Sequence, residues 1–365
     1  MMKKFVTLAL GMLLLVSLVA CGEKETPLEE DHSMYLITDK GTIDDKSFNQ
    51  GSFEGMKQYA DELGVTANYI RPEDVTTEDY LASIDEAVSK GAKVVVTPGF
   101  LFENAVYLAQ EKYPDVKFVL IDGTPKHPDT QEEKVAENTV AILYREEQSG
   151  FLAGYAAVKA GYTELGFMGG VAVPAVVNFG YGYLAGADYA AKELDITVNA
   201  RYTYLGDFIA DPKFVTQAVS WYNDGTEVIF SSAGGAGNSV MAAAEEFTDK
   251  FVIGVDVDQH DESDTVITSA MKNLQGSVYN VVKAALTDGF PGGEVQVLGV
   301  ESDGVALPDN FERLEGFTKA DYDAIYEALK ADKDGIASNI PTIATHGEKA
   351  SELKFDNLTV EAIGE

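Results

Sequence analysis

The chain has 365 residues, of which 45% are hydrophobic, so it is long enough for two domains that each bury a core. It carries 27 Lys and Arg against 60 Asp and Glu, and this acidity argues strongly against nucleic acid as a partner, because phosphate binding needs a basic face. A single Cys excludes a disulfide framework, and the four scattered His form no ligand pair. Neither a metal nor another cofactor is therefore expected.

The first residues predict an export signal. Two Lys precede an uncharged apolar run, Phe5 to Ala20, which is short for a membrane-spanning helix but suits a signal peptide. Leu18-Val19-Ala20-Cys21 resembles the lipobox of bacterial lipoproteins, in which the Cys is lipidated and becomes the first mature residue. We therefore expect a signal peptide at residues 1–20 and a lipid on Cys21, with a plain secretory signal as the alternative.

Residues 21–33 are polar and acidic and contain Pro27, so they predict a tether. Acyl chains would hold the protein at the outer face of the cytoplasmic membrane, because each buried CH₂ contributes roughly 0.8 kcal/mol. The sequence after the signal contains no second apolar run of membrane-spanning length. We expect a lipid-anchored particle that faces the outside of the cell membrane.

From residue 34, short apolar runs alternate with longer amphipathic ones. In the first half these runs predict strands at 34–38, 66–70, 93–97, 117–121 and 141–144, and helices at 47–63, 78–90, 103–112 and 146–160. Strands separated by helices of ten or more residues are typical of a parallel sheet covered on both faces. The segment 125–134 is rich in turn formers, which predicts a surface loop.

The same rhythm repeats in the second half. It predicts strands at 165–168, 197–204, 227–230, 251–255 and 266–269, and helices at 177–194, 212–222, 237–247 and 272–286. A helix is expected at 320–329 and a last strand at 355–363, whereas 295–300 is hard to place. We expect an α/β fold of two lobes: lobe 1 at 34–142, completed by about 270–290, and lobe 2 at 143–269, completed by about 291–365.

Polar residues and glycines follow several of the predicted strands. Asp39, Asp122 and Asp256 each follow an apolar strand, and so do the turn-rich segments 98–100, 169–170, 206–208 and 233–237. Ligands of parallel sheets gather outside the carboxyl ends of the strands, so these carboxylates would face a shared cleft that suits a neutral solute with hydroxyl and N–H groups. As alternatives, each Asp caps a helix, the glycines form a tight turn, and Phe48 and Phe208 are core residues.

Other kinds of site find weak support. The run from Asp256 to Asp261 has spaced carboxylates, but His260 breaks the EF-hand spacing and no Gly follows, which disfavours calcium. Gly235-Ala236-Gly237 lacks the third glycine of a dinucleotide fingerprint, and no P-loop Lys follows it. Because the chain has no nucleophile elbow, we do not expect an enzyme, although its many carboxylates leave an acid pair open.

Six segments, in order, resemble the basic membrane protein family of bacterial lipoproteins. These are substrate-binding proteins of ABC importers, typified by the purine nucleoside receptor A type. The matching segments are 37–50 (ITDKGTIDDKSFNQ), 113–123, 147–154, 233–237, 253–259 and 268–273. The resemblance implies a two-lobe fold like that of the first type of periplasmic binding proteins, with two parallel sheets, helices on both faces and three hinge crossings. It also implies an ABC permease as partner, and a monomer is expected.

The resemblance further implies a nucleoside, expected to be a purine nucleoside, held between the lobes. Two Phe sandwich the base in this family, and they fall on Phe48 and Phe208. Polar positions near the base match Asp39, Asn49 and Asp122, although Asp122 is also placed to serve the sugar. A flat purine suits this arrangement, because stacking contributes about 1–3 kcal/mol per base.

The ribose side matches Gly234, Asp256 and Lys272. A carboxylate can accept from both hydroxyls of a vicinal diol, so Asp256 is expected to bind the diol, with Lys272 as its buried partner. The acidic chain would repel nucleotides. The alternatives are a binding protein for a sugar or another small polar solute, a nucleoside-processing enzyme, and a surface adhesin or sensor.

Overall fold

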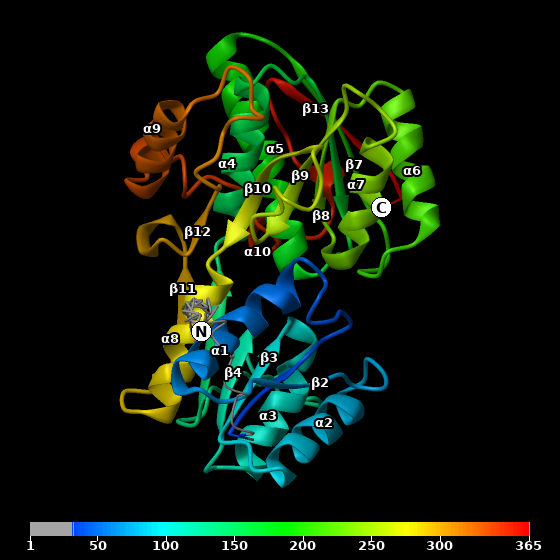
Figure 1. The fold of residues 1–365 in the computed structure, drawn as a ribbon. Helices are drawn as coiled ribbons and strands as arrows, with labels where there is room; N and C mark the ends of the chain where they lie inside the picture. The colour runs from blue at the N-terminus through cyan, green and yellow to red at the C-terminus, as the bar shows by residue number, and fades with distance from the viewer. Residues whose placement is uncertain (1–30, 32, 365) are drawn as a thin grey trace, which may run out of the picture.

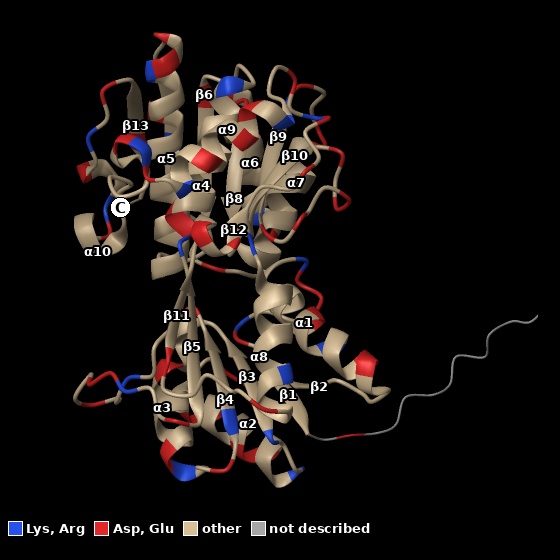
Figure 2. Ribbon diagram, turned by 90° about the vertical axis from the view of Figure 1, so that its left-hand side faces the viewer, with Lys and Arg blue, Asp and Glu red and all other residues tan. Residues whose placement is uncertain are grey.

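The computed structural model describes residues 31 and 33–364. Two lobes lie one above the other and are joined by a narrow waist (Figure 1). The predicted signal peptide, Cys21 and most of the tether lie outside the described residues. Within 33–364, no helix is long and apolar enough to cross a membrane. Acidic residues are spread over the helices and loops of both lobes, with fewer basic residues among them (Figure 2).

The first lobe is built on a six-stranded parallel sheet in the order β11-β5-β4-β3-β1-β2. Its strands are β1 (Met34–Ile37), β2 (Asn68–Ile70), β3 (Val94–Pro98), β4 (Lys117–Ile121), β5 (Thr139–Tyr144) and β11 (Val295–Leu298). Helices α1 (Phe48–Leu63) and α8 (Leu274–Leu286) cover one face, and α2 (Thr77–Ser89) and α3 (Glu103–Lys112) cover the other.

Strand β1 shows why the strands are apolar throughout. Met34 and Leu36 pack with α1, whereas Tyr35 and Ile37 pack with α2 and α3, because successive side chains of a strand point to opposite faces. All four side chains are buried. A sheet covered on both faces therefore needs a continuous apolar run, and this is the pattern seen in the sequence.

The second lobe has a seven-stranded sheet in the order β12-β10-β9-β8-β6-β7-β13, parallel except where β12 joins β10. Its strands are β6 (Glu164–Gly169), β7 (Val198–Tyr204), β8 (Val228–Ser232), β9 (Phe251–Asp256), β10 (Val266–Lys272), β12 (Val305–Ala306) and β13 (Leu358–Ala362). Helices α4 (Glu146–Lys159) and α5 (Pro174–Leu194) cover one face, and α6 (Pro212–Asn223) and α7 (Gly237–Ala244) cover the other. Two later helices, α9 (Lys319–Lys330) and α10 (Ile343–His346), lie beside α4 and α5 respectively.

Helices α4 and α5 approach so closely that their backbones touch. A Cβ at Gly150 or Gly154 would overlap the carbonyl oxygens of Phe179 and Tyr183 on α5, and a Cβ at Gly182 would overlap α4 in the same way. The small residues of α4 therefore allow the two helices to pack closely.

The chain crosses between the lobes three times, after β5, after β10 and after β11. The two-lobe fold with three crossings is thus as expected, but two assignments change. Residues 295–298 form β11, which pairs with β5 in lobe 1 and not with the second lobe, where the segment 291–365 was expected. Lys272 ends β10 and does not begin a helix, because Asn273 caps α8 through its side chain.

Candidate ligand-binding site

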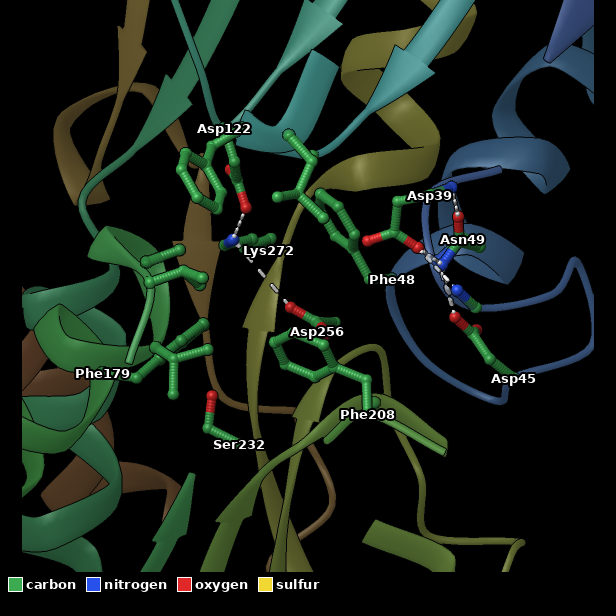
Figure 3. A pocket seen from close by; sticks show the side chains of 18 of the residues that line it. Asp39, Asp45, Phe48, Asn49, Asp122, Phe179, Phe208, Ser232, Asp256 and Lys272 are labelled. Carbon is green, nitrogen blue, oxygen red and sulfur yellow. Dashed lines mark hydrogen bonds and ion pairs between the residues drawn. The ribbon is translucent and has the colours of Figure 1, made fainter. Parts of the chain in front are cut away.

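A cavity lies between the lobes, at the carboxyl ends of the strands, and its empty space of about 730 Å³ includes a part open to solvent (Figure 3). The structure brings all eight predicted binding residues to its wall: Asp39, Phe48, Asn49, Asp122, Phe208, Gly234, Asp256 and Lys272. Their individual roles in binding stay predictions.

Twelve further residues line the cavity and were not predicted as binding residues: Gly41, Asp45, Gly99, Phe100, Leu101, Val173, Pro174, Ala175, Val176, Phe179, Ser232 and Gly235. Gly99, Phe100 and Gly235 belong to strand-end segments that the sequence did single out, although they were not predicted to bind the ligand. The start of α5, from Val173 to Val176, carries no polar signal, so only the topology reveals it. Ser232 closes an apolar strand, and its hydroxyl points toward the cavity (Figure 3).

One polar cluster lies at the start of α1 and is centred on Asn49. The Asn49 side-chain nitrogen donates to Asp39 Oδ1 and to Asp45 Oδ2, each at 2.8 Å, and its Oδ1 accepts from the Asp39 N–H at 3.2 Å. Asp39 Oδ1 also accepts from the Gly41 N–H at 2.8 Å. The Asn49 amide is thus used within the protein, and it holds Asp39 in place at the cavity wall.

Asp45 provides the helix cap that was the alternative role for the three predicted aspartates. Its two oxygens accept from the backbone N–H groups of Ser47, Asn49 and Gln50 at 2.9 to 3.1 Å. Burial raises the pKa of Asp45, and these hydrogen bonds oppose the rise. By fixing the first turn of α1, Asp45 sets the positions of Phe48 and Asn49 at the cavity.

A second polar cluster surrounds Lys272, at the end of β10. Lys272 Nζ lies 2.5 Å from Asp122 Oδ2, 3.2 Å from Glu146 Oε1 and 4.0 Å from Asp256 Oδ1. The side chain of this lysine is only 1% exposed. The expectation that Asp256 is the partner of Lys272 therefore needs correction: Asp122 and Glu146 lie closer, and Glu146 was not predicted to be near the site.

The charges of this cluster depend on burial. Burial lowers the pKa of Lys272, but the surrounding carboxylates outweigh it and raise that pKa above its ordinary value. Burial raises the pKa of Asp256 to about 6 and that of Glu146 to about 8. At neutral pH, Lys272 and Asp256 are therefore charged and Glu146 is largely protonated, and Asp122 is the nearest partner of Lys272.

Phe48 and Phe208 reach the cavity from opposite lobes (Figure 3). Phe48 begins α1, and Lys272 Nζ lies 5.1 Å from the centre of its ring. Phe208 follows β7, and its ring rests on Gly170, where a Cβ would overlap two ring carbons. Both rings are half-buried, and each packs against the hydrophobic core as well as lining the cavity.

Several bonds join the two lobes around the cavity. Ser47 Oγ of lobe 1 donates to Asp256 Oδ2 of lobe 2 at 2.6 Å. Lys40 Nζ lies 3.0 Å from Asp207 Oδ1, next to Asp39 and Phe208. Near the same edge, Gln259 donates to the Lys46 carbonyl at 2.7 Å. The cavity is therefore enclosed by contacts between the loop that precedes α1 and the strand ends of lobe 2.

The calcium alternative is not supported by the geometry. Asp256 faces Ser47 and Lys272, whereas Asp258 accepts from the backbone N–H of His260 at 3.0 Å. Among the described residues, no group of three or more acidic, His or Cys side chains is arranged to hold a metal ion.

Comparison with known protein families shows the family to which this chain belongs. Residues 33–335 match the family described as ABC transporter substrate-binding protein PnrA-like. The chain belongs to this PnrA-like family. It is 31% identical over 318 residues to basic membrane protein D of Borreliella burgdorferi, covering 86% of this chain and 88% of that protein.

Another relative carries a more specific name. The ABC transporter nucleoside-binding protein BmpA of Lactococcus lactis is 28% identical over 329 residues, covering 84% of this chain and 89% of the relative. Among solved structures, a solute-binding protein of an ABC transporter system from Aeropyrum pernix superposes with a TM-score of 0.67 at 24% identity, covering 86% of this chain and 89% of that one.

Membership of the PnrA-like family decides the class of activity. The protein is a substrate-binding protein of the ABC transporter type and not an enzyme. The alternative of a nucleoside-processing enzyme is thereby set aside.

Proposed function

We propose that the protein captures nucleosides, with purine nucleosides as the expected class, and delivers them to the permease of an ABC importer. The observation that carries this proposal is a cavity lined by Phe48 of lobe 1 and Phe208 of lobe 2, with a polar cluster on either side of Phe48. A flat base between two rings, with a polar edge and an attached sugar, fits such a wall. The name of the Lactococcus lactis relative supports the same class of ligand.

We propose that the Asp39 cluster binds the edge of the base through a hydrogen bond. Asp39 Oδ1 already accepts two hydrogen bonds, whereas its Oδ2 has no hydrogen-bond partner in the described part of the chain. An ionised Oδ2 would accept from an N–H group on the edge of the base. Asn49 was expected to contact the base itself, and we now assign it the role of holding Asp39.

The Lys272 cluster, together with Gly234, is proposed to bind the ribose. Carboxylates accept hydrogen bonds from hydroxyls, and a charge-assisted bond contributes about 1.5–3 kcal/mol. Three carboxylates around one ammonium group also disfavour an added phosphate, so nucleosides are preferred to nucleotides. A sugar would satisfy the hydroxyl-binding groups but leave Phe48 and Phe208 without a base between them.

The ligand that co-purifies with the protein tests this proposal. The protein is purified without denaturation and unfolded, and the released small molecules are analysed by mass spectrometry and ultraviolet absorbance. We expect one purine nucleoside per chain. Titration with adenosine, guanosine, uridine, free ribose and adenosine monophosphate should give the tightest binding for a purine nucleoside. Tight binding of ribose with no effect of a base would contradict the proposal and favour a sugar-binding protein.

We also propose that a lipid on Cys21 holds the protein at the outer face of the cell membrane. Cys21→Ala should move the protein from the membrane fraction to the soluble fraction, while Ser17→Ala, outside the Leu-Val-Ala-Cys run, should leave it membrane-bound. Equal membrane retention of the two variants would rule out the anchor. The protein is expected to act as a monomer, which light scattering of the mature chain measures.

A further inference from the structure

We propose that four contacts outside the cavity form a latch between the lobes and set the rate at which an enclosed ligand is released. The latch consists of the ion pairs Lys40–Asp207 and Lys46–Glu262, the hydrogen bond from Gln259 to the Lys46 carbonyl, and the close approach of Val257 to Gly51. None of these seven residues lines the cavity. The inference goes beyond the proposed nucleoside function, because such a latch acts on any ligand that the lobes enclose.

Gln259 is the buried member of the latch, with 2% of its surface exposed. Its Oε1 accepts from the Val255 N–H at 2.9 Å, and its own N–H donates to Ser269 Oγ at 3.0 Å, so the residue is fixed between β9 and β10 of lobe 2. Its Nε2 donates across to the Lys46 carbonyl of lobe 1 at 2.7 Å. Separation of the lobes breaks this hydrogen bond, which is strengthened by its enclosure away from water.

Both sides of this hydrogen bond are held in place. On the lobe 1 side, Lys46 has left-handed backbone with φ of 62°, which is uncommon for a residue other than glycine and sets the direction of its carbonyl. On the lobe 2 side, Arg313 Nη1 donates at 2.9 Å to three carbonyls of the loop after β9, those of His260, Ser263 and Val266. The loop that carries Gln259 is therefore braced, and the latch joins two rigid surfaces.

The approach of Val257 depends on a glycine in α1. A Cβ at Gly51 would lie 2.8 Å from Val257 Cγ1 of lobe 2, closer than carbon atoms normally approach, and 3.1 Å from Leu274 Cδ1 of lobe 1. Glycine inside a helix is destabilising relative to alanine, so its presence here is explained by the space that it leaves for lobe 2. A methyl group at this position should hold the lobes apart.

The two ion pairs make the latch sensitive to salt. Their four side chains are between 31% and 43% exposed, and ion pairs at such exposed positions are individually weak and screened by dissolved ions. In each pair the lysine belongs to the loop before α1 and the carboxylate belongs to lobe 2. Raising the salt concentration should therefore speed the release of ligand.

Release is measured by stopped flow, with the fluorescent purine nucleoside 2-aminopurine riboside displaced by excess adenosine. Gly51→Ala should release the probe about 10- to 100-fold faster than the wild type, because an added methyl group is forced against Val257. Val257→Ala in the same chain should restore most of the loss. Gln259→Glu keeps the acceptor for the Val255 N–H but removes the donor to Lys46, and it should speed release about tenfold.

Lys40→Met and Lys46→Met should each speed release about 2- to 5-fold and reduce the salt dependence. Lys57→Met is the matched control, because it removes an exposed lysine of α1 whose partner, Asp61, lies on the same helix. It should keep both the release rate and the salt dependence of the wild type. Should Gly51→Ala or Gln259→Glu fail to fold, these exposed variants decide: values equal to the wild type for both Lys40→Met and Lys46→Met overturn the latch.

The rescue by Val257→Ala separates the latch from damage within lobe 1. Fast release that persists in the double variant would show that Gly51→Ala acts inside its own lobe, and it would contradict the inference. Small-angle X-ray scattering without ligand adds an independent measurement: Gly51→Ala should have a larger radius of gyration than the wild type, and equal radii also contradict the latch. If the probe and adenosine do not bind the wild type, the nucleoside function is rejected, and the scattering alone decides whether the latch exists.

Discussion

The two lobes repeat one topology but supply different chemistry to the cavity. Their first four strands run in matching orders, β4-β3-β1-β2 in lobe 1 and β9-β8-β6-β7 in lobe 2. Lobe 1 has Asp39 after its first strand and Phe100 after its third. At the equivalent places, lobe 2 has Gly170 and the Gly234 turn.

The helices that begin at the cavity also differ between the lobes, because the first turn of one carries a polar residue and the first turn of the other is apolar. Helix α1 of lobe 1 starts with Phe48 and Asn49, whereas α5 of lobe 2 starts with Pro174-Ala175-Val176. Gly170 leaves space for the Phe208 ring, which enters from the next loop along the sheet. Lobe 1 thus supplies most of the fixed polar groups, and lobe 2 supplies most of the apolar wall, together with Asp256 and Lys272.

The largest expected effect comes from removing the cation that serves carboxylates of both lobes. Lys272→Met leaves Asp122, Glu146 and Asp256 without their shared partner, and breaking a buried ion pair in this way costs about 3–5 kcal/mol. Urea denaturation should show this loss of unfolding free energy. Lys283→Met removes an exposed lysine that pairs with Glu62, and it should change stability by less than about 0.5 kcal/mol. Equal small effects would show that the cluster around Lys272 is hydrated and weak.

Removing one ring from each lobe tests whether the two sides share the base. Phe48→Ala and Phe208→Ala should each weaken purine nucleoside binding by about 1–3 kcal/mol, with little change in melting temperature. Calorimetric titration with adenosine and guanosine measures the loss. A variant that binds as tightly as the wild type identifies its ring as a structural residue, and the sandwich would then have one face only.

Raising the pH should increase the affinity for the ligand but decrease the stability of the free protein. Burial raises the pKa of Asp39 and of Asp256 from 3.8 to about 6, and both groups must be ionised to accept hydrogen bonds from the ligand. Affinity for adenosine should therefore fall roughly tenfold for each of the two carboxylates, or about a hundredfold in all, between pH 7.5 and 5. In the free protein, these raised pKa values contribute stability below about pH 4, and that contribution is lost as the pH rises through 6.

Thermal unfolding with and without adenosine across this pH range checks both signs. Asp39→Asn and Asp256→Asn should each flatten part of the dependence. A nucleoside affinity that does not change from pH 7.5 to 5 in the wild type would show that neither carboxylate accepts from the ligand.

The smallest expected effect comes from a substitution at Gly170, the lobe 2 residue that leaves space for the Phe208 ring. Gly170→Ala should push the Phe208 ring into the cavity and weaken nucleoside binding several-fold, because an added methyl group in a filled site costs about 1–3 kcal/mol, part of which is relieved by movement of the ring. The same substitution in a Phe208→Ala background should have almost no effect on affinity. Equal effects in both backgrounds would mean that Gly170 acts through the sheet and not through the ring.

The sequence predicted the sheets well because each buried strand is a continuous apolar run. It predicted residues that line the cavity because the carboxyl ends of those strands carry Asp39, Asp122 and Asp256, and because the family motifs point to Phe48 and Phe208. Contacts between side chains that are distant in the sequence were harder to predict. Glu146 is distant from Lys272 in the chain, and only the crossing after β5 brings it within 3.2 Å.

The edge strand β11 was missed for a related reason. Val295 and Val297 are about half exposed, so their short alternating pattern gives no indication of which sheet the strand joins. The pairing with β5 is set by the third crossing, a feature that single-sequence periodicity does not contain. Likewise, nothing in the sequence around Asn49 indicates that its side-chain nitrogen donates hydrogen bonds to Asp39 and Asp45.

The three crossings also determine the order in which the molecule can be completed as it emerges from a ribosome or a translocation channel. Lobe 1 begins with β1 but lacks α8 and β11 until residue 298 has emerged, by which time five strands of the second sheet have already passed. The apolar face that α8 covers therefore stays open through most of synthesis. The N-terminal lobe finishes late, and a chain truncated before residue 274 would leave that lobe unfinished and prone to aggregation.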